Sequence, residues 1–199
     1  APIFDRRLDA IRAKVHRGER LALADGDLLH TAPDIWTVCE LADQVRRRLH
    51  GDVAYYNINR HLNYSNICAL SCKFCEFYAR DGDAKAYTRD LAYIREEARQ
   101  AVEAGATEIH SVGGLHPTLP FSYYTDLVAT LRDEARRLGS DLHVKAFTAA
   151  EYDFFSRRFK KPLEEIFDDF KRAGLGSLPG GGAEVLVERV RREIYPKKI

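Results

Sequence analysis

The sequence has 199 residues, of which 45% are hydrophobic and 31% are charged, and its formal net charge is +1. This composition is typical of a compact globular chain and excludes long disordered segments and a strongly basic nucleic-acid-binding surface. The sequence has no apolar leader and no stretch near the ~18 apolar residues of a membrane span, so we expect a cytoplasmic protein without nucleic-acid or membrane partners.

The first 50 residues are predicted to form helices. Apolar residues recur with helical spacing from Phe4 to Val15 and stop before Gly18, and a longer helix is expected between Pro33 and about Leu49. Glycine and proline at such positions are typical of helix boundaries. Cys39 falls within the second helix and is expected to pack in the core as a small hydrophobic side chain. We therefore predict an N-terminal helical segment over residues 1–50.

Strands and helices alternate from residue 51 onward. We predict strands at 53–62, 107–112 and 142–147, a fourth strand running into 178–182, and helices at 91–104, 123–138, 163–173 and 184–193. Such alternation indicates an α/β fold with a parallel sheet. A closed barrel of eight βα units takes roughly 250 residues. Residues 51–199 are therefore predicted to be a partial TIM-type β/α barrel of about four units.

Three cysteines after the first predicted strand form the array C-x-x-x-C-x-x-C, namely Cys68, Cys72 and Cys75. Three thiolates so close together can hold three irons of a [4Fe–4S] cluster and leave the fourth iron open to S-adenosylmethionine. The array, with the aromatic Phe74 before its last cysteine, resembles the radical SAM signature. A zinc site with a histidine such as His61 is the alternative, which would make the chain a metal-stabilised binding module without catalysis. Clustered thiols also favour a reducing compartment.

Strand alternation predicts which side chains face the inside of the barrel. One face of the first strand carries Asn57, Asn59 and His61, the opposite face carries Tyr56, Ile58 and Leu62, and the inner face of the third strand carries His143, Lys145 and Phe147. A polar interior is unfavourable unless it binds a polar ligand or its residues satisfy one another. For Lys145 we favour ligand binding, whereas for His61 and His143 both interpretations stay open.

Two glycine-rich turns follow the second and fourth predicted strands. They are Gly113-Gly114 and Gly180-Gly181-Gly182, and the second leads to Glu184. Glycine lets a backbone approach a ligand closely. Because these turns lie at the same end of the barrel as the cysteine loop, we predict that they line a pocket for S-adenosylmethionine, with ordinary tight turns as the alternative. His116 is either a turn residue or a substrate contact.

Residues 56–68, 112–117, 143–148 and 178–184 together resemble the aminofutalosine synthase family of the futalosine route to menaquinone. The resemblance implies that a 5′-deoxyadenosyl radical adds to the double bond of 3-[(1-carboxyvinyl)oxy]benzoate. Rearrangement and loss of the carboxylate carbon then give 6-amino-6-deoxyfutalosine. It implies a [4Fe–4S] cluster, S-adenosylmethionine as a consumed co-substrate, and a one-electron reductant such as flavodoxin or ferredoxin. Enzymes that make cyclic dehypoxanthine futalosine or the deazaflavin cofactor are the related alternatives.

The resemblance also implies roles for single residues. Cys68, Cys72 and Cys75 match the cluster ligands of the family. Phe74 matches the aromatic residue near the adenine, and Gly113 and Gly114 match the glycine pair near the methionine amino group. A nucleoside contact is assigned to Glu184, beyond the triple glycine Gly180-Gly181-Gly182 that is predicted to line the cofactor pocket. The candidate catalytic residues are Lys145, His61 and Arg60. Lys145 or Arg60 would pair a substrate carboxylate, because charged groups shielded from water need ionic or hydrogen-bonded partners.

The predicted barrel has too few strands to close. Its fourth strand would keep an unpaired edge, which is a surface that normally binds another strand. We therefore expect the 199-residue chain by itself to hold a cluster, to bind the benzoate substrate poorly and to associate.

Overall fold

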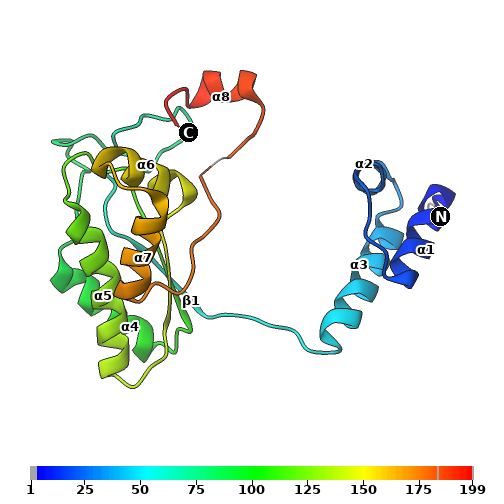
Figure 1. The fold of residues 1–199 in the computed structure, drawn as a ribbon, viewed down its shortest axis with the longest axis horizontal. Coiled ribbons are helices and arrows are strands. Elements are labelled where there is room, and N and C mark those ends of the chain that lie inside the picture. Colours follow the sequence, from blue (N-terminus) through cyan, green and yellow to red (C-terminus); the bar gives the residue numbers. More distant parts are fainter. Residues whose placement is uncertain (1–3, 183, 199) are drawn as a thin grey trace. The chain divides into compact units, whose positions relative to one another are not determined.

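The computed structural model describes residues 4–182 and 184–198 and contains two units (Figure 1). Contacts divide the chain into Ala1–Tyr56 and Asn57–Ile199, and each unit has a hydrophobic core of its own. The sequence predicted the division after residue 50. Within the described residues, no helix is both long enough and apolar enough to cross a membrane.

The N-terminal unit is helical. It contains the short 3-10 helix η1 (Arg6–Leu8), α1 (Asp9–Arg17), α2 (Leu23–Thr31) and α3 (Ile35–His50), of which α2 was not predicted. The first of the long helices ends where expected, because Gly18 adopts a φ of 71° that glycine tolerates without strain. The core of this unit is formed by Leu8, Ile11, Val15 and Leu41.

Cys39 is exposed on α3, so its predicted place in the core is wrong. Residues four positions apart share one face of a helix, and α3 buries Thr37 and Leu41. Cys39 lies between them in sequence and therefore points to a different side of the helix.

The C-terminal unit alternates strands with helices, as predicted. Its elements are β1 (Asn59–Asn63), α4 (Leu91–Glu103), β2 (Glu108–Val112), α5 (Phe121–Arg137), β3 (His143–Ala146), α6 (Ala149–Phe159), α7 (Leu163–Ala173) and α8 (Glu188–Ile194). The three strands form a parallel sheet in the order β1-β2-β3. In this sheet His61 pairs with His110, and His110 with Lys145. The fold is an α/β arrangement that corresponds to part of a TIM-type barrel.

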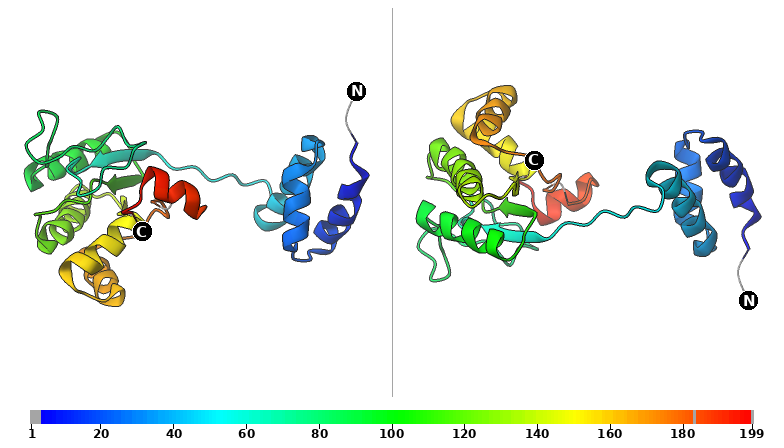
Figure 2. Two further views of the ribbon diagram at one scale, coloured as in Figure 1. Left: turned by 90° about the horizontal axis from the view of Figure 1, so that it is seen from above. Right: turned by 90° about the horizontal axis from the view of Figure 1, so that it is seen from below.

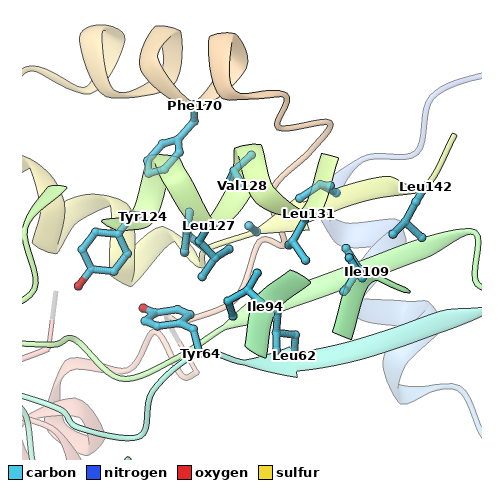
Figure 3. Close-up of a cluster of buried hydrophobic side chains, with 14 of the residues drawn as sticks. Leu62, Tyr64, Ile94, Ile109, Tyr124, Leu127, Val128, Leu131, Leu142 and Phe170 are labelled. Carbon is cyan, nitrogen blue, oxygen red and sulfur yellow. The ribbon is translucent and has the colours of Figure 1, made fainter. Parts of the chain in front are cut away.

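Helices cover one face of the sheet. Leu62 and Ile109 point from β1 and β2 toward Ile94 of α4 and Leu131 of α5 (Figure 3). The two helices pack against each other along the strands, as Figure 2 shows. This apolar layer fixes the strand register, because a slip by one residue would turn the buried side chains to the other face. The opposite face of the strands consequently carries polar side chains, among them His61, His110 and Lys145.

Several predicted boundaries differ from the structure. β1 begins at Asn59 and not at residue 53, because its ladder partner β2 begins only at Glu108. The predicted fourth strand is reduced to a single bridge between Ser177 and Lys145, since Pro179 and the following glycines are poor strand residues. The last helix begins at Glu188, later than predicted, and α6 was not predicted at all.

Phe147 lies in the hydrophobic core and not on the polar face where alternation placed it. Its φ of 63° is a left-handed conformation, which is uncommon for a bulky residue and interrupts the alternation just after β3. The ring consequently packs against Tyr124 and Phe155, with ring centroids 5.8 and 5.3 Å away. Burial of the aromatic ring offsets the strained backbone.

Candidate functional site

A cleft of about 400 Å³ opens at the carboxyl ends of β1 and β2. Chemistry in parallel β/α folds is assembled at this end of the strands. Of the residues predicted to form the site, the cleft is lined by Cys68, Cys72, Cys75, Phe74, Gly113, Gly114, Gly182, Glu184 and His61. Lys145, Arg60, Gly180 and Gly181 are not among its lining residues.

The cysteine loop is docked onto the turn that follows β2. The Ala69 amide donates to the Leu115 carbonyl at 2.8 Å, and the Leu115 amide in turn lies 3.4 Å from Cys68 Sγ. A second amide, that of Leu70, also points at this sulfur from 3.4 Å. Two backbone N–H groups are therefore directed at Cys68 Sγ, the atom that would bind a metal.

The three thiols suit a cluster better than a single metal ion. All three are free and half-buried, and they share one cleft. Burial raises the pKa of the Cys72 thiol, and nearby Cys68 and Cys75 add to the rise while Lys198 opposes it. In the described part of the chain, no three His, Cys, Asp or Glu side chains converge where one ion would bind. In a [4Fe–4S] cluster each thiolate takes a different iron, so such convergence is not required.

Close packing requires the glycine pair after β2. It lies against residues 64–67, the stem of the cysteine loop. A Cβ on Gly114 would lie 2.2 Å from the carbonyl oxygen of Ile67, and one on Gly113 would lie 2.6 Å from the Tyr64 ring. The Gly114 amide donates to Ser65 O at 2.8 Å. The pair therefore holds two βα loops together at the floor of the cleft, which the sequence alone did not predict.

Glu151 is a buried carboxylate in the cleft that the sequence analysis missed. Its side chain accepts from the Tyr64 hydroxyl at 2.8 Å, the Gly113 amide at 3.1 Å, and the Thr148 amide and hydroxyl at 2.7 and 2.8 Å. Burial raises the pKa of Glu151 to about 7, although these donors oppose the rise. The T-x-x-E pattern of a helix capping box, Thr148 to Glu151, was the available signal.

The polar face of the sheet largely satisfies itself. Lys145 Nζ lies 2.8 Å from a carboxylate oxygen of Glu108, which also accepts from Asn59 at 2.7 Å. His143 Nε2 lies 2.7 Å from Ser177 Oγ. Toward the cleft, His61 contacts Asn63 at 2.9 Å and packs edge to face on His110, whose pKa is lowered by burial. Lys145 is therefore ion-paired within this face.

Arg60 is not brought to the cleft. It lies with Leu62 on the face that the helices cover, where its guanidinium donates to Glu97 of α4 at 2.8 Å. A second bond, at 3.1 Å, goes to Gln100. Neighbouring residues of a strand point to opposite faces, so Arg60 and His61 cannot both face the interior. The ion pair with the nearly buried Glu97 explains this arginine without a substrate.

The segment around α8 covers the outer side of the cysteine loop. Its Tyr195 is buried and packs edge to face on Phe74, with ring centroids 5.7 Å apart. Lys198 Nζ lies 5.7 Å from the centre of the Phe74 ring and 2.6 Å from Glu184 Oε1. Both ends of this ion pair line the cleft, so the segment contributes a cation to it.

His116 is buried and neutral, and it anchors the turn after β2. Its Nδ1 accepts from the amides of Thr118 and Leu119 at 3.2 and 3.3 Å, which assigns the ring proton to Nε2. Nε2 lies 3.1 Å from Thr88 Oγ1, which in turn lies 3.0 Å from Ser65 Oγ. These contacts give His116 a structural role as a turn residue.

We expect His116 to make folding stability depend on pH. Burial lowers its pKa, so the unfolded chain binds a proton near pH ~6.5 while the folded protein does not. Its contribution to stability is therefore complete above that pH and is lost as the pH falls toward the lower folded pKa. Urea midpoints should fall more for the wild type than for His116→Asn, which retains an acceptor but does not titrate.

The difference between these two proteins is the quantity to measure. Glu151, with its raised pKa of about 7, acts in the opposite direction, because its ionised form is the one that burial disfavours. Equal pH dependence of the wild type and His116→Asn would contradict the prediction.

Comparisons with known proteins show the family of this chain. Residues 62–198 match the Radical SAM superfamily. The aminodeoxyfutalosine synthase of Thermus thermophilus is 40% identical over 99% of this chain and 52% of its own length. The aminodeoxyfutalosine synthase of Streptomyces coelicolor is 39% identical over 92% of this chain and 46% of its own length. A 5-amino-6-(D-ribitylamino)uracil–L-tyrosine 4-hydroxyphenyl transferase of Nostoc is 38% identical over 96% and 50%. The chain thus spans about half the length of the curated relatives it matches.

Solved structures show the same fold. The FeFe-hydrogenase maturase HydG matches 98% of this chain and 41% of its own with a TM-score of 0.75 at 16% identity. The structure of methylornithine synthase PylB matches 83% of this chain and 56% of its own, with a TM-score of 0.51 at 19% identity. The predicted resemblance to aminofutalosine synthases is confirmed, and the relatives are enzymes. With its cysteine array at the carboxyl edge of a parallel sheet, the chain belongs to the radical SAM superfamily.

Proposed function

We propose that this protein joins a 5′-deoxyadenosyl group to 3-[(1-carboxyvinyl)oxy]benzoate and forms 6-amino-6-deoxyfutalosine, the reaction that the resemblance implies. The observation that carries the proposal is the cleft in which the three signature thiols face the glycine pair Gly113-Gly114. The identity to aminodeoxyfutalosine synthases along nearly the whole chain supports this choice of reaction.

Cys68, Cys72 and Cys75 would hold a [4Fe–4S] cluster, which when bound supplies the electron that cleaves S-adenosylmethionine. The chain itself contributes the surroundings. Leu115 and Leu70 direct amides at Cys68 Sγ, and Phe74 and Tyr78 add apolar wall to the cleft. Such a wall keeps water and other reactants from a radical. We further propose a cytoplasmic location and a small one-electron carrier such as flavodoxin or ferredoxin as reductant, because clustered thiols favour a reducing compartment.

Both substrates bring carboxylates into the cleft, so cationic or N–H partners must meet them. Lys198 lines the cleft, and Lys145 lies on the polar face in register with His110, which pairs with the cleft residue His61. We propose that Lys145 exchanges part of its pairing with Glu108 for a substrate carboxylate.

Lys145→Met should weaken substrate binding by about 1.5–3 kcal/mol, the value of a charge-assisted hydrogen bond. It should also destabilise the fold, because Glu108 would keep its charge in a site where only 10% of its side chain is exposed. The double variant Lys145→Met/Glu108→Gln separates the two effects. It should recover stability in urea unfolding but not substrate affinity, whereas recovery of both would make Lys145 purely structural.

A second candidate is the deazaflavin-cofactor reaction. The relatives named as 5-amino-6-(D-ribitylamino)uracil–L-tyrosine 4-hydroxyphenyl transferases reach 38% identity over 96% of the chain, nearly as high as the aminodeoxyfutalosine synthases. Because the two identities differ by only two percentage points, the choice of substrate is decided by experiment.

The test is a pair of incubations with the reconstituted, dithionite-reduced protein and S-adenosylmethionine. One contains the enolpyruvyl benzoate, and the other contains the ribitylaminouracil with tyrosine. A product with the mass of 6-amino-6-deoxyfutalosine is expected in the first incubation, in low yield because this chain is expected to bind the benzoate substrate poorly. A product only in the second would favour the alternative reaction, and stoichiometric zinc without acid-labile sulfide would favour a non-catalytic module.

A further inference from the structure

Glu151 connects all three loops that leave the carboxyl ends of the strands. One carboxylate oxygen faces the Tyr64 hydroxyl, just after β1, and the Gly113 amide, just after β2, at 2.8 and 3.1 Å. The other oxygen faces the amide and hydroxyl of Thr148, just after β3, at 2.7 and 2.8 Å. Only 1% of Glu151 is exposed. The carboxylate thus ties together segments that are far apart in the sequence.

The loop held by Glu151 extends to Leu115, whose amide contacts the sulfur of the proposed cluster ligand Cys68. Gly113 lies two residues before Leu115, whose amide points at Cys68 Sγ from 3.4 Å. The Tyr64 hydroxyl adds a second contact to the same loop, 3.2 Å from the Gly114 carbonyl. The loop is in direct contact with residues 64–67, which lead into the cysteine loop, and this contact leaves no room for a side chain at Gly113 or Gly114. A shift at Gly113 is therefore transmitted to the donor at Cys68.

Hydrogen bonds to the sulfurs are one determinant of the reduction potential of an iron–sulfur cluster. Reduction adds one electron, and part of its charge falls on the ligand sulfurs. An N–H donor stabilises that charge, so its loss makes the potential more negative.

We propose that Glu151 is a positioning residue that sets the reduction potential of the cluster, by holding residues 113–115 so that the Leu115 amide donates to Cys68 Sγ. This inference rests on the proposed function, because it requires that the thiols hold a cluster. Glu151 itself does not touch Cys68; it acts through the loop.

The test is a redox titration of the reconstituted cluster, followed by electron paramagnetic resonance and without S-adenosylmethionine. Glu151→Gln should have a more negative midpoint potential than the wild type, with an unchanged iron and sulfide content. With its NH₂ group toward Gly113, glutamine loses the bond to that amide. With its NH₂ group toward Thr148, it loses the bond that orients the side chain toward Gly113, so the loop at Gly113 is loosened in either orientation. The matched control is Glu134→Gln, which removes a buried carboxylate paired with Arg137 on α5 and should leave the potential unchanged.

A midpoint of Glu151→Gln equal to that of the wild type, with the cluster intact, would overturn the inference. If Glu151→Gln does not fold, Tyr64→Phe decides, since it keeps the ring and removes only the hydroxyl beside Glu151 and Gly114; an unshifted potential in that variant would equally overturn the inference. Failure of the wild type to assemble a four-iron cluster would instead refute the proposed function, so the two failures are distinguishable.

Discussion

Replacing Cys75 with alanine should abolish S-adenosylmethionine cleavage and leave the fold intact. The loop around Cys75 is held by backbone bonds that the substitution retains, such as the Cys75 amide to the Cys72 carbonyl at 3.0 Å. A [4Fe–4S] cluster held by two protein thiolates instead of three loses one of its anchors, so we expect it not to assemble stably. Iron content and 5′-deoxyadenosine formation should both fall to background.

Cys39→Ala is the matched control, because this cysteine is exposed on a helix of the other unit. It should retain full iron content and cleavage. Circular dichroism of both variants should match the wild type. Cleavage retained by Cys75→Ala would show that this thiol is not a cluster ligand.

Gly114→Ala should be the most destabilising single-methyl change at the cleft. The added Cβ would lie 2.2 Å from the Ile67 carbonyl oxygen and 2.7 Å from its carbonyl carbon. Both are backbone atoms, which cannot move aside as a flexible side chain does. Overpacking typically costs 1–3 kcal/mol, and we expect about 3 kcal/mol here because two loops must separate. The urea midpoint of the C-terminal unit should fall accordingly.

Gly180→Ala is the control in the same unit, since a Cβ there meets no atom within 4 Å and its backbone is not left-handed. It should leave the midpoint within experimental error. If Gly114→Ala unfolds at the same urea concentration as Gly180→Ala, the close contact between the β2 turn and the cysteine stem is not present in solution.

Local signals in the sequence determined the fold class and the superfamily. Helix 163–173 was predicted with its observed bounds, because a Pro162 start and a Gly174 stop flank a strongly amphipathic stretch. The spacing of Cys68, Cys72 and Cys75, which lie within one loop, led to the prediction of a radical SAM protein, and the chain belongs to that superfamily. Alternation also predicted that Lys145 and His61 share the polar face of the sheet.

Only the tertiary structure decided which of these residues reach the cleft. Glu151 bonds to Tyr64 across 87 positions of sequence, and Arg60 to Glu97 across 37, so no local pattern contains either pair. Phe147 leaves the predicted face because an aromatic core was available to bury its ring. The periodicity of a sequence indicates only which face of a helix or strand is apolar and which is polar. Burial and charge pairing depend on segments that folding brings together, and these set the partners of Glu151, Arg60 and Lys145.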